Sequence, residues 1–221
     1  MNLLRQGSLL GERPHYVAPV EGTHASTLSE LLGKLEAGAR AIDLTGLRQY
    51  FDRQPDGIRT CFERTKRLPA GCDLYRDDAG LRVRERVLPE PSVSLLPVLE
   101  RCVAQILASA RSPAVALSGG LDSALVLALV RRVAGRPVPV LTLATGLPGY
   151  CELEQTLATA HALGGNDVDV IEAEPEQMVH VLPAAIAACE TPLFNLHPVS
   201  KLLLARAAAQ RGHDAVITGD G

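Results

Sequence analysis

The second half of the chain alternates between short apolar runs and longer stretches in which apolar residues recur three and four positions apart. Helical spacing of this kind predicts helices over residues 95–107, 122–133, 152–163, 176–188 and 198–209. The apolar runs predict strands over residues 114–117, 138–144, 167–171 and 215–217. Strands that alternate with helices of this length form right-handed βαβ units. We therefore predict an α/β fold with a doubly wound parallel sheet and flanking helices.

One proline falls inside this pattern. Pro183 lies in the predicted helix 176–188, where proline lacks the N–H group that the helix needs. We expect the helix to be kinked or split there.

The first ninety residues show a shorter and more mixed pattern. Residues 27–30 have the T-x-x-E form of a capping box and precede leucines at helical spacing, which predicts a short helix. A second short helix is predicted over 47–51, and the turn at 77–80 predicts a β-hairpin. Large apolar residues are few, so we expect a small, partial α+β segment that packs against another element. The change of pattern near 89–91 predicts two domains, residues 1–90 and 91–221.

Composition and charge narrow the classes of protein. The chain has 221 residues and a formal net charge of -3, which argues against the basic surface that nucleic acid or an anionic membrane requires. No apolar stretch is long enough to cross a bilayer. The five cysteines include no C-x-x-C pair, so a zinc site or a disulfide framework has little support. We predict a cytoplasmic protein with reduced thiols, and neither nucleic acid nor a membrane as a partner.

The most informative string is Ser118-Gly119-Gly120-Leu121-Asp122-Ser123, between the first predicted strand of the sheet and its helix. The first N–H groups of a helix lack partners and lie at the positive end of the helix dipole. Two adjacent glycines let phosphate oxygens approach the backbone, and the two serines add hydroxyl donors. Asp122 would repel a bare phosphate, so it fits only beside a bridging metal ion. A tight turn with Asp122 as helix cap is the simpler alternative, but the whole string in this position favours a nucleotide site.

This string is neither a Walker A loop nor a G-x-G-x-x-G fingerprint. It resembles the pyrophosphatase-type loop (PP-loop) of enzymes that split ATP into AMP and pyrophosphate. Further segments occur in the order and approximate spacing seen in asparagine synthetases, namely Ala144–Gly149 (A-T-G-L-P-G), Cys189–Pro192 (C-E-T-P) and Ile217–Gly221 (I-T-G-D-G). Upstream, Arg59–Glu63 and Arg67–Gly71 resemble the end of that family's glutaminase domain. The resemblance covers roughly residues 44–221.

The resemblance implies an adenine-nucleotide α-hydrolase-like fold, with ligands at the carboxyl ends of the strands. The residues that it implies for the pyrophosphate end of ATP are Ser118, Gly119, Gly120, Asp122 and Ser123. Those that it implies for the AMP pocket are Leu117, Thr145, Thr218 and Gly219. Asp122 would also be the magnesium ligand and act in catalysis. Asp220, at the acidic position of the family's S-G-[DE]-G string, is the second expected catalytic residue and would position the adenylated intermediate or its amine.

The activity implied by the resemblance is that of an ATP-dependent carbon–nitrogen ligase. Such an enzyme adenylates a carboxylate, here expected to be aspartate, releases pyrophosphate, and transfers the acyl group to an amine or ammonia. The expected cofactors are ATP and Mg²⁺. The expected partners are a small-molecule carboxylate and an amine or ammonia.

Two departures from the family leave alternatives open. The chain begins Met1-Asn2-Leu3, whereas a glutamine-dependent member has cysteine after its first methionine, so glutamine hydrolysis is not expected. It ends at Gly221, before the family's acidic pair and a later lysine.

One alternative is internal amide formation of the β-lactam synthetase or lasso-peptide cyclase type. Another is a non-catalytic, ATP-binding half of a split enzyme, with a second polypeptide supplying the C-terminal half or a glutaminase. A tRNA thiolase or an NAD synthetase shares the loop, but the Gly-Leu-Pro-Gly segment at 146–149 favours an asparagine synthetase.

Three polar residues near these motifs have simpler interpretations. His161 is expected to be a surface or core histidine, and His197 a turn residue before a proline. Lys201 could point into the site, but a solvated helix face is the simpler expectation.

Overall fold

The computed structural model describes residues 1–9, 13–53, 55–87, 94–146, 151–164 and 167–220. The chain forms two compact units. The N-terminal unit comprises Met1–Glu90 and Ile186–Asn195, and the sheet unit comprises Pro91–Ala185 and Leu196–Gly221. The sequence pattern places residues 186–195 in the second domain, together with the helices on either side. The expected domain boundary at 89–91 lies outside the described residues.

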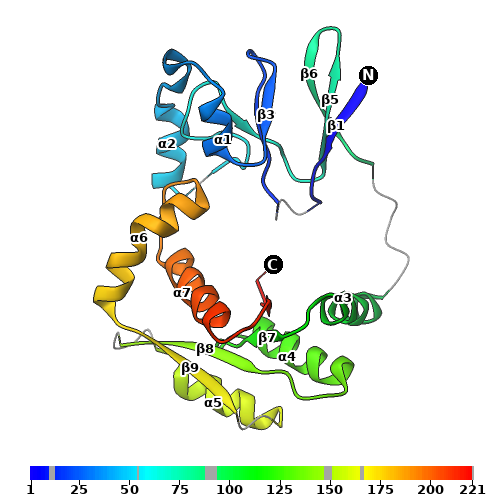
Figure 1. Ribbon diagram of the computed structural model, residues 1–221, viewed down its shortest axis with the longest axis vertical. Helices are drawn as coiled ribbons and strands as arrows, with labels where there is room; N and C mark the ends of the chain where they lie inside the picture. Colours follow the sequence, from blue (N-terminus) through cyan, green and yellow to red (C-terminus); the bar gives the residue numbers. More distant parts are fainter. Residues whose placement is uncertain (10–12, 54, 88–93, 147–150, 165–166, 221) are drawn as a thin grey trace. The chain divides into compact units, whose positions relative to one another are not determined.

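The sheet unit is built on four parallel strands in the order β10-β7-β8-β9 (Figure 1). Their bounds are Pro113–Ala116 for β7, Val140–Thr145 for β8, Val168–Ala173 for β9 and Ala215–Ile217 for β10. Val115 of β7 pairs with Ile217 on one side and with Val140 on the other. Because the strands are parallel, the loops that follow them meet at one edge of the sheet.

Helices cover both faces of this sheet. Those on one face are α3 (Leu95–Ser109), α4 (Leu121–Ala134) and α5 (Leu153–Ala162), whose side chains pack with Val115, Val140 and Ile217. On the other face, α7 (His197–Gln210) packs on the alternate strand residues, which include Ala114, Leu141 and Ile171. The helix α6 (Pro175–Cys189) lies beside β9 and α7. The predicted doubly wound parallel α/β fold is therefore confirmed.

The helix α6 is continuous where the sequence predicted a kink or a split at Pro183. It runs from Pro175 to Cys189 with Pro183 inside it, so the helix is not split. Proline in a helix interior removes one backbone hydrogen bond, which is costly but leaves the flanking turns intact. Met178, Val181 and Ala185 are buried on both sides of Pro183, and their packing offsets that cost.

The N-terminal unit contains two small antiparallel sheets, with strand orders β1-β5-β6 and β3-β2-β4. Their strands are Asn2–Gln6 (β1), Tyr16–Ala18 (β2), Thr23–Ala25 (β3), Lys66–Arg67 (β4), Cys72–Asp77 (β5) and Gly80–Glu85 (β6). The predicted hairpin is β5–β6, whereas β1 to β4 were not predicted. Three of these four have only two or three residues, too few for an alternating pattern to be recognised.

Three short helices complete this unit, namely α1 (Leu28–Gly33), the 3₁₀ helix η1 (Ala37–Arg40) and α2 (Leu44–Phe51). Tyr16, Leu28 and Leu31 form a small core of their own. The predicted cap of α1 is present, because Thr27 Oγ1 accepts the Glu30 N–H at 3.1 Å. The Glu190 carboxylate accepts the N–H groups of Leu28 and Ser29 at 2.7 and 2.8 Å. Segment 186–195 is thereby attached to the start of α1 through two charge-assisted hydrogen bonds.

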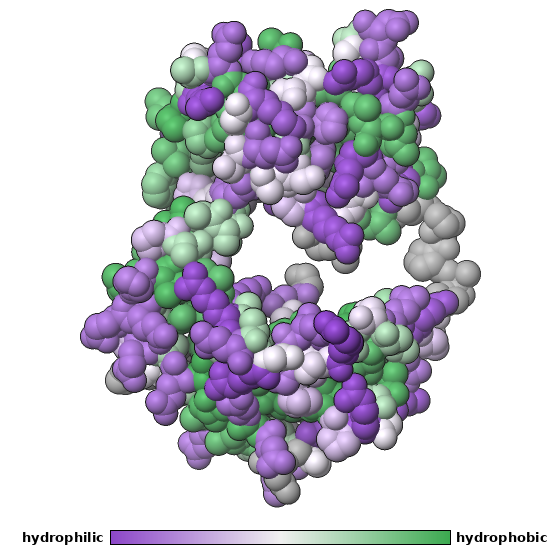
Figure 2. Space-filling model, viewed as in Figure 1, coloured by the Kyte–Doolittle hydropathy of each residue, from purple (hydrophilic) through white to green (hydrophobic). Residues whose placement is uncertain are grey.

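The surface of the molecule in Figure 2 is a mixture of hydrophilic and hydrophobic residues. Exposed apolar side chains include Leu95 and Leu96 of α3 and Val179 of α6. Among the described residues, no helix combines the length and the hydrophobicity needed to cross a membrane.

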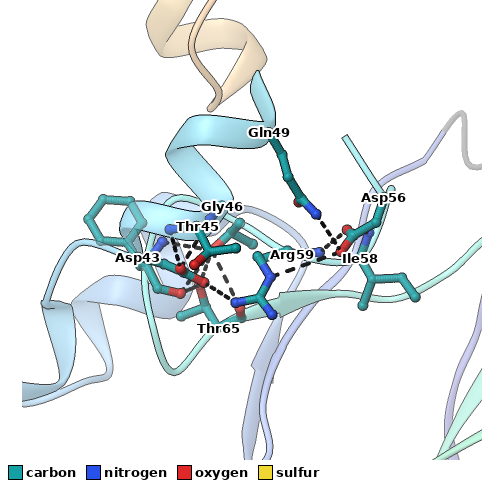
Figure 3. Close-up of polar contacts among 10 residues, drawn as sticks. Asp43, Thr45, Gly46, Gln49, Asp56, Ile58, Arg59 and Thr65 are labelled. Carbon is teal, nitrogen blue, oxygen red and sulfur yellow. Dashed lines mark hydrogen bonds and ion pairs between the residues drawn. The ribbon is translucent and has the colours of Figure 1, made fainter. Parts of the chain in front are cut away.

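A polar network fixes the start of α2 (Figure 3). The Asp43 carboxylate accepts the N–H groups of Thr45 and Gly46, each at 3.0 Å, and the Arg59 guanidinium donates to its other oxygen at 2.8 Å. Burial by itself raises the pKa of Asp43, but the hydrogen bonds from Gly46 and Arg59 outweigh it, and the pKa lies below its ordinary value. Ionised Asp43 therefore stabilises the folded chain.

We expect Asp43→Ala to lower the free energy of unfolding by about 1–2 kcal/mol at pH 7, because α2 loses its cap. The stabilisation by ionised Asp43 is present above the unfolded pKa, and it is lost as the pH falls through the lower folded pKa. The difference between wild type and variant should thus narrow below about pH 4. Denaturant unfolding of the whole chain at several pH values measures this difference in unfolding free energy. Asp78→Ala, in the exposed hairpin turn, is the control. A difference that stays constant down to pH 2 would contradict a role for the charge.

Candidate active site

A cavity of about 350 Å³ opens at the carboxyl ends of the sheet-unit strands. Its walls come from the end of β7 and the loop after it, the first turn of α4, the middle of β8, the start of α5, one side of α7 and the loop after β10. In open α/β sheets this edge is where ligands bind, because the loops there converge and the helices begin there.

The loop after β7 is held in shape by its own serines. The buried Ser123 hydroxyl lies 3.0 Å from Ser118 Oγ and 3.0 Å from the Gly120 carbonyl oxygen, and it accepts the Ser118 N–H at 3.1 Å. Ser118 Oγ accepts the Gly120 N–H at 3.3 Å. Ser123 thus forms its hydrogen bonds within the loop, and it lines the cavity together with Gly119, Gly120 and Asp122. The loop presents a preformed turn followed by the start of a 14-residue helix.

The loop after β10 lies against this helix start. A Cβ atom placed on Gly219 would lie 2.5 Å from the Ser123 backbone nitrogen and 2.7 Å from the Asp122 carbonyl carbon. No residue with a side chain fits at that distance without moving backbone atoms, so glycine is required at position 219. This contact places Thr218 and Asp220 next to the β7 loop, on the same cavity.

Most of the predicted site residues meet here. Leu117, Thr218, Gly219 and Asp220 line the cavity together with the loop residues Ser118, Gly119, Gly120, Asp122 and Ser123. Thr145 does not line it. It is the last residue of β8, where it pairs with Ala173 of β9, and its contact with a nucleotide stays a prediction. Of the motif residues, 147–149 and Gly221 lie outside the described residues.

Other residues of the cavity wall were not predicted. They include four polar side chains near the starts of α5 and α7, namely Glu152, Thr156, Ser200 and Lys201. Gln155 Nε2 of α5 donates to the Gly119 carbonyl oxygen at 2.9 Å, so α5 also supports the loop. Lys201 is exposed, as expected for a solvated helix face, and its ammonium also lies 3.0 Å from Asp220 Oδ1 at the cavity. The sequence could have indicated these residues only by their place near predicted helix starts, because helices that follow parallel strands begin at the ligand-binding edge.

The residues present suit a magnesium ion that arrives with a nucleotide. Asp122, Glu152 and Asp220 bring carboxylates to the cavity, but among the described residues no three potential ligands form a metal cluster. Mg²⁺ commonly uses one or two carboxylates and completes its shell with phosphate oxygens and water. The carboxylate of Glu152 lies at Gly119, where Oε2 would be 2.9 Å from an added Cβ, and Asp122 follows Gly120 in the first turn of α4.

A family profile described as asparagine synthase matches residues 94–221, which is more than half of the chain. The chain belongs to the asparagine synthase family. Members of this family are ATP-dependent ligases that form amides, and the matched region contains the whole cavity. No curated protein matches the chain.

Solved structures with a similar arrangement are distant. An NH3-dependent NAD synthetase from Campylobacter jejuni is 20% identical, with a TM-score of 0.35, over 53% of this chain and 54% of that one. A glutamine-dependent NAD+ synthetase from Acinetobacter baumannii, in complex with ADP, is 16% identical, with a TM-score of 0.38, over 65% of this chain and 29% of that one. An NMN synthetase from Francisella tularensis is 18% identical, with a TM-score of 0.36, over 53% of this chain and 52% of that one. The match therefore spans about half or less of these proteins.

We expect Gly219→Ala to destabilise the chain by about 1–3 kcal/mol, because the new Cβ displaces the backbone of the α4 start. Gly120→Ala is the matched control, since its Cβ would meet only Ser118 Oγ, at 3.4 Å. Thermal unfolding measures both. Equal melting temperatures for the two variants would contradict the close contact at Gly219.

Proposed function

We propose that this member of the asparagine synthase family adenylates a carboxylate with ATP and converts it into an amide, with aspartate as the carboxylate. The observation that carries the proposal is that one cavity joins the loop 118–123 to the Thr218–Asp220 loop. The first loop suits a polyphosphate, because backbone N–H groups and glycines lie at a helix start. The second loop brings the Asp220 carboxylate to the same cavity, where it would accept the proton of an attacking amine.

The chemistry needs an activated carboxylate, because oxide is a very poor leaving group. A carboxylate oxygen attacks the α-phosphorus of ATP, the bond from that phosphorus to the bridging oxygen breaks, and pyrophosphate leaves. The nitrogen of ammonia or an amine then attacks the acyl carbon, the bond from this carbon to the AMP oxygen breaks, and the nitrogen loses a proton. Such reactions depend mainly on positioning and on neutralising charge.

The roles proposed for individual residues follow from their places in the cavity. Gly119 and Gly120 would let the β- and γ-phosphates reach the first N–H groups of α4, which the serine bonds of the loop hold ready. Leu117, Thr218 and Gly219 would border the AMP moiety. Asp220 would hold the adenylated intermediate or accept the proton of the attacking amine.

Magnesium would be held by Asp122 and by the phosphates, and when bound it supplies positive charge against the departing pyrophosphate. Asp122 itself supplies one carboxylate, at the second position of α4. Its backbone carbonyl carbon is adjacent to Gly219, so its place is fixed by the packing of the two loops.

The test is pyrophosphate release from magnesium ATP by this chain, with ammonia present, and with or without aspartate. We expect release only with a carboxylate substrate, together with formation of AMP and the amide. We expect Asp122→Ala to reduce the rate about a hundredfold or more, because charge neutralisation at the phosphates is lost. Asp78→Ala, at an exposed turn of the β5–β6 hairpin, is the matched control and should keep full activity.

The remaining outcomes separate the alternatives. Release that requires a carboxylate bearing its own amine, with a cyclic product, would show internal amide formation instead of aspartate amidation. Binding of ATP without any release would contradict catalysis by this chain and would favour a non-catalytic half of a split enzyme.

A further inference from the structure

The cavity contains one ion pair that the proposed reaction does not use. Lys201 Nζ of α7 lies 3.0 Å from Asp220 Oδ1 of the β10 loop, and both side chains are little more than half exposed, at 56% and 55%. An ion pair with this much exposure stabilises a fold only weakly, so folding alone does not explain it. Its two members come from different walls of the same cavity.

The position of Lys201 follows from the packing of α7. Leu204, three residues further along the helix, packs with the core on that face of the sheet and also lines the cavity. Residues three or four positions apart share a helix face. Lys201 therefore projects from the same side of α7, in the first turns, toward the edge of the sheet where the strands end.

The charges around the cavity make Lys201 distinctive. Among the described residues that line it, Lys201 is the one basic side chain, whereas Asp122, Glu152 and Asp220 are acidic. A triphosphate brings several further negative charges into this space. An ammonium group on a flexible four-carbon chain can leave one oxygen anion for another within its reach.

We propose that Lys201 is a phosphate-binding residue, and that Asp220 holds its ammonium in place until the nucleotide arrives. On binding, the ammonium passes from the Asp220 carboxylate to a phosphate oxygen. Asp220 is then released from its ion pair and can interact with the amine. This inference rests on the proposed function, because it assumes that the cavity binds ATP.

The experiment compares binding of magnesium ATP to the full chain by calorimetry, which needs no turnover. We expect Lys201→Met to weaken binding about tenfold, because one charge-assisted hydrogen bond to phosphate is lost. Lys201→Arg should restore most of the affinity, since it keeps the positive charge. Lys66→Met is the matched control, because Lys66 is exposed on β4 of the N-terminal unit, and it should bind like wild type.

The second variant is Asp220→Asn. If Lys201 passes from Asp220 to a phosphate, this variant should change the affinity for magnesium ATP in the opposite direction. Removing the carboxylate frees the ammonium for phosphate, so we expect binding of magnesium ATP to become about threefold tighter. The same variant should lose amide formation. If Asp220 were a magnesium ligand, Asp220→Asn would instead weaken binding, and that result would overturn the proposal.

Separate titrations with AMP and with pyrophosphate show which phosphate Lys201 contacts. A loss confined to pyrophosphate places the contact on the leaving group, and a loss with AMP places it on the α-phosphate; either supports the proposal. Unchanged ATP binding by Lys201→Met overturns it and leaves the proposed function intact. Absence of ATP binding by the wild type overturns both.

Discussion

The close contact between Gly219 and the first turn of α4 is the interaction on which the rest of the site depends. It brings the β10 loop against the β7 loop at a distance that only glycine permits. The parallel pairing of Ile217 with Val115 sets the two strands in the register that makes this contact possible. Thr218 and Asp220 thereby line the same cavity as the glycines and Asp122. One backbone contact thus joins the phosphate end of the cavity to the end where an acyl group would react.

Much of the site is arranged before any ligand binds. The Ser118–Ser123 bonds hold the β7 loop, and Gln155 supports this loop from α5. Pre-organised donors reduce the reorganisation that charge transfer would otherwise require. The family assignment and the cavity at the carboxyl edge of the parallel sheet are both consistent with the nucleotide site proposed here.

The elements of the sheet unit could be predicted from the sequence, but the residues that line the cavity could be predicted only in part. Strands and helices there are long and periodic, and the string 118–123 indicated its own chemistry. The sequence alone did not decide whether Lys201 lines the cavity, because the orientation of this side chain depends on how α7 packs through Leu204. The unbroken passage of α6 through Pro183 likewise depends on buried contacts that no local pattern contains. In the N-terminal unit, the attachment of Glu190 to the start of α1 joins residues 162 positions apart, beyond any local signal.

The most direct test of the account is hydrogen exchange of the whole chain with and without magnesium ATP. Protection should increase in residues 117–124 and 218–220, where N–H groups and the facing loop would meet the nucleotide. Residues 135–140, at the opposite ends of the strands, should exchange as before and serve as the internal control. Protection at that opposite edge, or no change around 117–124 despite saturating nucleotide, would contradict the central claim that ATP binds at the carboxyl edge of this sheet.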